Sequence, residues 1–235
     1  MSKTKTKAGR QNIGSAFDLL EKSLDIVKKN WQAFAVVNVF AILSALDQAF
    51  NRRDVSGWDK STWSGLSGIQ LASILGLSFL AVLVFVAIEF FFATMMVSLH
   101  VKSTAGKKPS VSDLFEDGKK YFFRLLGLVI LMGLLIAGGL VLFIVPGVIA
   151  IGRVALAPFY LIDKNVSIME ALKMSNEKAK GNMGPVYSAI GVTILIAIVS
   201  GFIGIVPLIG PIVGVGITIA YSLVLALRYQ QLKKI

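Results

Sequence analysis

The sequence predicts an all-α integral membrane protein with six transmembrane helices, arranged as three hairpins that are each preceded by a cytoplasmic amphipathic helix. Three observations support this fold class: the chain is very apolar, proline and glycine interrupt its longest apolar runs, and a short polar helix pattern recurs. We expect a basic N-terminal tail at residues 1–12 and one membrane domain at residues 13–235. Its threefold internal repeat covers approximately residues 13–100, 110–163 and 166–228.

Composition sets the class of protein. Of the 235 residues, 55% are hydrophobic and only 16% are charged, and the mean hydropathy is +0.76. Ordinary soluble domains have roughly 25% charged residues. Because a hydrocarbon core about 30 Å thick is crossed by about 20 helical residues, apolar runs of that length predict membrane spans.

Four apolar regions are long enough, and the last two are about twice the length of one crossing. The regions are Trp31–Leu46, Ile69–Leu99, Leu125–Ile162 and Val186–Leu227. Residues that break helices lie inside both long regions, namely Pro146 and Gly147 in the third and Pro207, Gly210 and Pro211 in the fourth. Folding back at these positions gives six spans, although residues 148–162 are short enough to form a re-entrant segment instead.

The distribution of basic residues predicts the orientation. With the N-terminus inside, 20 of the 24 lysines and arginines fall on inner segments. Arg52, Arg53 and Lys60 stay outside, and Arg153 lies within an apolar run. Since lysine and arginine accumulate on the cytoplasmic side of short loops, both termini are predicted to be cytoplasmic.

A polar helix pattern recurs on the predicted inner side. Five residues of the first copy are matched at identical offsets in the last copy: Ser15, Asp18, Leu20, Ser23 and Asn30 correspond to Ser167, Glu170, Leu172, Ser175 and Asn182. A middle copy has Ser110, Asp113 and Phe115, and then Gly118 in place of the second serine. Serine followed by an acidic residue three positions later indicates a capping box at a helix start. The alternative is that this common pattern recurs by chance and marks no repeat. We predict three interfacial helices whose lysines face anionic lipid.

Several kinds of chemistry are excluded by residue type. The chain has no cysteine and one histidine, His100, so neither a disulfide nor a cysteine- and histidine-based metal site is expected. No phosphate-binding loop is present, and the basic residues are too dispersed for a nucleic-acid surface. Gly210 and Gly214 form a GxxxG pattern that indicates close helix packing. We therefore predict no enzyme activity, no cofactor, no metal and no nucleic-acid partner.

Two ionisable residues fall inside apolar runs, where a charge costs at least roughly 2.5 kcal/mol on insertion scales. Glu89 lies 11 residues from His100, and Arg153 lies 10 residues from Asp163, which places the two at similar depths. This match predicts an intramembrane ion pair. The pair could clamp two spans or line a solute or proton path, and the alternative is no pairing, with Arg153 reaching outward. Lesser polar candidates are Asn38, which we expect in a helix–helix hydrogen bond, His100 and Asp163.

Residues 144–182 resemble the YciC-like bacterial multi-pass membrane proteins and the related membrane domain that precedes some bacterial glycerophosphodiester phosphodiesterases. The matching elements are Pro146-Gly147, Arg153, Asp163, Glu170-Ala171-Leu172, Ser175 and Lys180-Gly181. The resemblance implies a six-span protein of the bacterial inner membrane and carries over no catalytic residue. Because no soluble segment exceeds about 30 residues, we expect no phosphodiesterase domain here.

The sequence thus favours a non-enzymatic protein that organises the membrane or binds a partner or lipid through its cytoplasmic interfacial helices. The expected partners are the bilayer and its anionic headgroups, with a protein partner or a second copy of the chain also possible. The alternative is a transporter of a small solute or lipid, with its path near Glu89 and Arg153.

Overall fold

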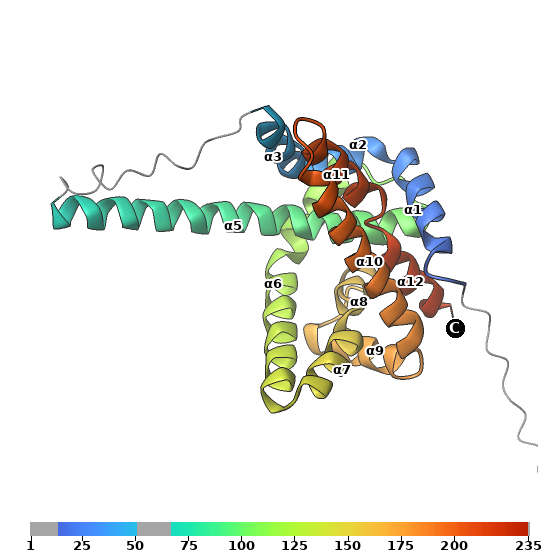
Figure 1. Cartoon of the computed structure of the whole chain (residues 1–235). Helices are drawn as coiled ribbons and strands as arrows, with labels where there is room; N and C mark the ends of the chain where they lie inside the picture. Colours follow the sequence, from blue (N-terminus) through green and yellow to red (C-terminus); the bar gives the residue numbers. More distant parts are fainter. Residues whose placement is uncertain (1–13, 51–66, 235) are drawn as a thin grey trace, which may run out of the picture.

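A computed structural model describes residues 14–50 and 67–234, and these residues are helical, with no strand among them (Figure 1). The predicted all-α class is confirmed. The predicted basic tail at residues 1–12 and the predicted outer residues Arg52, Arg53 and Lys60 lie outside the described residues.

Five helical segments are long and apolar enough to cross a membrane, and a bent helix pair makes a sixth if it counts as one crossing. This number agrees with a multi-pass membrane protein. The straight spans are α5 (Gly68–Thr104), α6 (Val111–Leu142) and α10 (Met183–Gly204). Two further spans are interrupted helices, α7 (Ile144–Val154) with α8 (Ala157–Asp163), and α11 (Gly210–Ala220) with α12 (Val224–Lys233).

The sixth candidate bends at Asn38. Here α2 (Trp31–Val37) meets α3 (Val39–Phe50) at an angle of 72°. The Asn38 amide nitrogen donates to the Phe34 carbonyl oxygen at 2.8 Å and lies 3.9 Å from the Met96 sulfur on α5. The predicted helix–helix contact of Asn38 is therefore a weak bond to sulfur, and its stronger bond caps its own helix.

Two of the three predicted polar helices are separate elements, α1 (Asp18–Lys29) and α9 (Ile168–Lys180). The prediction of a separate middle helix is wrong, because the chain from Val111 runs without a break to Leu142. The physical reason is the position of the residues that end helices. Asn30 ends α1, and Gly181 with Asn182 ends α9, whereas no comparable breaker follows the middle copy.

The predicted capping differs among the copies. Ser110 and Asp113 form the reciprocal capping box, with both bonds at 3.1 Å, and the Ser167 hydroxyl accepts from the Glu170 amide at 3.3 Å. The box predicted for Ser15 and Asp18 is wrong. Helix α1 begins only at Asp18, so the Ser15 hydroxyl instead accepts from the Phe17 amide at 3.1 Å, ahead of the first helical turn.

Both long apolar regions fold back, but the first break comes three residues before the predicted one, so that Pro146 and Gly147 lie inside α7. The first reversal lies at Phe143, where the backbone is extended, and Pro146 falls in the first turn of α7. The first turn tolerates proline because its amides have no intrahelical partner. The second reversal occupies residues 205–209, which include Pro207 and Leu208 at φ 66°, and Gly210 and Pro211 then start α11. Residues 148–162 belong to a 20-residue segment long enough for a full crossing.

Each polar helix segment packs on a span. Helix α9 lies against α7 and α8, which precede it, α6 crosses α5, which precedes it, and α1 lies against the distant α11 and α12 (Figure 1). The first helix therefore contacts the last span. The largest buried side chains gather where these elements meet, at Leu19, Leu99, Leu114, Leu156, Tyr160 and Tyr229. By contrast, residues 72–88 of α5 are all exposed, and this apolar half projects from the bundle in Figure 1.

Candidate functional site

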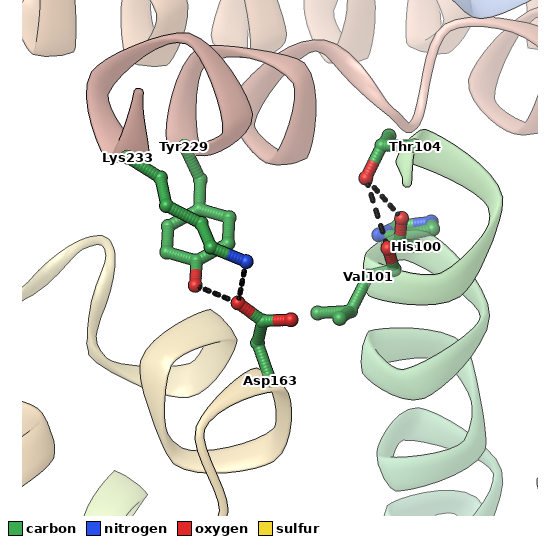
Figure 2. Close-up of polar contacts among 6 residues, drawn as sticks. All are labelled: His100, Val101, Thr104, Asp163, Tyr229 and Lys233. Atoms are coloured by element: carbon green, nitrogen blue, oxygen red, sulfur yellow. Dashed lines mark hydrogen bonds and ion pairs between the residues drawn. The ribbon is translucent and has the colours of Figure 1, made fainter. Parts of the chain in front are cut away.

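Asp163, at the end of α8, joins that helix to α12. Its Oδ2 accepts a hydrogen bond from the Tyr229 hydroxyl at 2.5 Å and pairs with the Lys233 ammonium at 2.5 Å (Figure 2). Tyr229 and Lys233 are four residues apart, so they lie on one face of α12 and reach the same carboxylate. The Asp163 side chain is 15% exposed and that of Lys233 is 31% exposed. This polar candidate from the sequence is therefore a clamp between two spans.

A cavity of about 440 Å³ lies beside this clamp. It is lined by Tyr160, Lys164, Met174, Glu177, Lys178 and Lys233, which come from α8, α9 and α12 and from the residue after α8. The Tyr160 side chain is 2% exposed, and its buried hydroxyl has no hydrogen-bond partner among the described residues. Three lysines and one carboxylate, that of Glu177, line the cavity, and the Asp163 carboxylate beside it is paired with Lys233. The cavity therefore has an excess of positive charge and an unused hydroxyl, which suit an anion.

His100 lies on neighbouring α5 and does not join the Asp163 clamp. Its ring stacks on that of Phe34 in α2, with ring centroids 6.1 Å apart. The His100 carbonyl oxygen accepts from the Thr104 hydroxyl at 2.6 Å, while the ring Nε2 is buried with no partner among the described residues (Figure 2). Within the described part of the chain, no group of three or more His, Cys, Asp or Glu residues is arranged to hold a metal ion. His100 is thus packed between helices.

The structure does not bring Glu89 and Arg153 together. The described ion pairs join Lys102 with Asp117 and Lys233 with Asp163. Glu89 is half-buried on α5, whereas Arg153 is exposed near the end of α7, which packs on α6, α9 and α10. The predicted depth match assumed an unbroken helix from Arg153 to Asp163, but the helix is interrupted between Val154 and Ala157. Two residues at similar depths in different spans are neighbours only if those spans pack together with the two side chains facing each other, and here they do not.

Two fully buried serines bridge the interrupted spans. The Ser175 hydroxyl of α9 donates to the Arg153 carbonyl oxygen at 2.6 Å and accepts from the Leu156 amide at 3.2 Å. The Ser23 hydroxyl of α1 donates to the Ala220 carbonyl oxygen at 2.8 Å and accepts from the Leu223 amide at 3.3 Å. In both spans the bonded groups are three residues apart and flank the break between two helices. The serines thus satisfy backbone groups that the breaks leave unpaired.

Replacing either serine by alanine should destabilise the protein by about 1–3 kcal/mol, because two buried backbone groups lose their partner. Ser73→Ala is the matched control, since its exposed hydroxyl bonds only to Ile69 in its own helix. The measurement is the midpoint of unfolding by a denaturing detergent. Equal midpoints for Ser175→Ala and Ser73→Ala would show that the buried bridge adds no stability.

Sequence reasoning selected Asp163 but missed its partners. Nothing in the local sequence sets Tyr229, Lys233 or Tyr160 apart, so none of them was predicted as a site residue. The four-residue spacing of Tyr229 and Lys233 places them on one face of α12 but does not indicate which helix packs against that face. The serine bridges had a signal, because Ser23 and Ser175 occupy the same offset in the two matched copies.

Comparisons with known proteins identify a family for this chain. No curated protein and no solved structure gave a significant match. A family match, however, covers residues 39–226, from the start of α3 to within α12. It includes both reversals, the span of α7 and α8 with Asp163, and the break between α11 and α12, and it ends before Tyr229 and Lys233. The chain therefore belongs to the uncharacterised protein family UPF0259.

Proposed function

We propose that this protein is a non-enzymatic, multi-pass protein of the bacterial inner membrane that binds anionic lipid headgroups at its cytoplasmic face. The observation that carries the proposal is the cavity beside Asp163. Lys164, Lys178 and Lys233 line it together with Tyr160, whose hydroxyl has no hydrogen-bond partner among the described residues. A phosphate group accepts hydrogen bonds from both kinds of donor.

The two separate polar helices support this assignment. Each buries one face against the spans and exposes lysines on the other, namely Lys22, Lys28 and Lys29 on α1 and Lys173 and Lys180 on α9. A helix with this pattern lies in the headgroup plane. Each well-placed lysine adds about 1 kcal/mol of attraction to an anionic surface. The positive-inside rule places this face, and both termini, in the cytoplasm.

We also propose that the bundle is a threefold repeat closed into a ring. Its support is that Ser23 and Ser175, at equal offsets in the sequence, make the same pair of hydrogen bonds to interrupted spans. In the middle unit, Gly118 occupies that offset and lies against Phe91 and Met95 of α5, which is not interrupted there. A serine occurs at this offset where the packed span is broken, and glycine occurs where the span is continuous.

Transport is the weaker candidate. Its predicted path depended on an ion pair between Glu89 and Arg153, and these residues are apart. The interrupted spans of known transporters present unpaired backbone groups to an ion. Here the hydroxyls of Ser23 and Ser175 already bond groups at both breaks. A scaffold that binds lipid therefore explains more of the described features.

A titration with phosphatidylglycerol tests the proposal. Purified protein in neutral detergent should melt at a higher temperature as phosphatidylglycerol is added, and the increase should saturate, whereas phosphatidylcholine should have little effect. Lys164→Gln with Lys178→Gln should weaken the phosphatidylglycerol affinity by tenfold or more, at about 1 kcal/mol for each lysine.

The matched control is Lys119→Gln with Lys120→Gln, which removes the same charge from exposed positions outside the cavity. This control should retain the affinity of the unmodified protein. Equal responses to the two lipids, or equal losses in the two double variants, would refute a specific headgroup site.

A further inference from the structure

A second cavity, of about 560 Å³, lies on another side of the bundle, between the segment that leads into α1 and helix α10. Arg228 of α12 lines it and is only 1% exposed. Arg228 Nη1 donates to the Gly14 carbonyl oxygen at 3.1 Å and to Gln231 Oε1 at 2.8 Å. Its Nε is buried with no hydrogen-bond partner among the described residues. A guanidinium has five N–H donors, so this one has donor capacity left for a ligand.

The charge of Arg228 is not neutralised by a direct ion pair in the described part of the chain. Asp18, at the start of α1, is the carboxylate that interacts with it electrostatically, but no ion pair within 4.0 Å joins the two. Taking a charged group out of water without a paired partner is costly, so such groups normally have a counter-ion. An anionic ligand in the cavity would supply one.

The rest of the cavity is an apolar groove along one face of α10. Its lining residues recur at helical spacing, at Gly184, Pro185, Ser188, Gly191, Val192 and Leu195. From Gly184 to Leu195 the groove follows about 16 Å of helix. A Cβ built at Gly184 or at Gly191 would have no atom within 4 Å. Glycines in membrane helices usually let another helix approach, but no helix among residues 14–50 and 67–234 fills this groove.

We propose that this groove binds one anionic phospholipid, with its phosphate at Arg228 and one acyl chain along the glycine face of α10. Arg228 lies five residues before Lys233, about 7.5 Å of helix from the basic end of the span, which suits a headgroup depth. The groove then runs toward the middle of α10, where an acyl chain belongs. This inference rests on the proposed function and adds a second, separate lipid site to it.

Native mass spectrometry of the full chain, released from membranes that contain phosphatidylglycerol and phosphatidylethanolamine, tests the proposal by counting bound lipids. We expect two retained phosphatidylglycerol molecules per chain, one in each cavity. Gly191→Phe fills the groove without a clash and should reduce occupancy of the groove at least fivefold, leaving one. The matched control is Gly133→Phe on α6, also exposed with no atom within 4 Å of its Cβ, which should retain both.

Two variants separate this inference from the proposed function. The double variant Lys164→Gln, Lys178→Gln should lose only the lipid in the cavity beside Asp163. An unchanged lipid count in this variant would overturn the proposed function but would leave the proposed lipid site in the groove intact. An equal lipid count in Gly191→Phe and Gly133→Phe would overturn the groove. Arg228→Lys should retain the charge but reduce the preference for phosphatidylglycerol over phosphatidylethanolamine, since lysine lacks the guanidinium fork. An unchanged preference would show that Arg228 does not recognise the headgroup.

Discussion

Replacing Gly214 by valine should reduce the free energy of unfolding by about 2–3 kcal/mol, one of the two largest losses predicted for the variants described here. A Cβ at this position would lie 2.8 Å from the Ser200 carbonyl oxygen of α10. Because that atom belongs to the backbone, it cannot rotate away, and α10 and α11 must separate. The predicted GxxxG packing of Gly210 and Gly214 is thus present, since a Cβ at Gly210 would also meet backbone, at the Ile203 carbonyl oxygen.

Gly216→Val is the control for this prediction. Gly216 lies two residues away on α11 and is exposed, with no atom within 4 Å of its Cβ. Its substitution should change stability by less than about 1 kcal/mol, because only helix propensity changes. Unfolding in increasing denaturing detergent measures both variants. Equal midpoints for the two would mean that α10 and α11 do not approach closely at Gly214.

Breaking the clamp on Asp163 should have an effect of similar size. Asp163→Leu should cost about 2–3 kcal/mol, because the Lys233 ammonium and the Tyr229 hydroxyl both lose their acceptor in a partly buried position. The loss should appear as a lower yield of monodisperse protein and a lower unfolding midpoint. The cost is lower than that of breaking a fully buried pair, because water reaches part of the Lys233 side chain.

A charge exchange separates the ion pair from simple packing. Asp163→Lys combined with Lys233→Asp restores opposite charges on α8 and α12 and should recover about half or more of the stability lost in the single variants. Glu177→Gln serves as the control, since this exposed residue lines the cavity but does not contact Asp163. If the exchange is no more stable than the sum of its single variants predicts, the clamp is not electrostatic.

Much of this fold could be predicted from local sequence. Apolar run lengths predicted the spans, and the proline and glycine residues predicted both reversals, because these signals act within a few residues of where they occur. Sequence also predicted the polar helices at α1 and α9, since Asn30 and Asn182 mark where they end. It failed at α6, where a capped polar turn continues directly into a span.

The candidate site was harder to predict, because it depends on which spans become neighbours. The depth of a residue in a span follows from counting residues. The rotation of the span about its axis, and the spans it packs against, do not. Glu89 and Arg153 therefore matched in depth and yet lie apart. Arg228 and Tyr160 gave no signal at all, since burial without a hydrogen-bond partner is visible only once the helices are assembled.

The bridge from Ser23 has a consequence for biosynthesis. Its hydroxyl bonds residues that lie 197 and 200 positions further along the chain. A ribosome makes α1 long before residues 220–223, so α1 cannot reach its final place until those residues have been made. Until then the position that α11 and α12 will occupy in the bundle must stay open in the nascent chain.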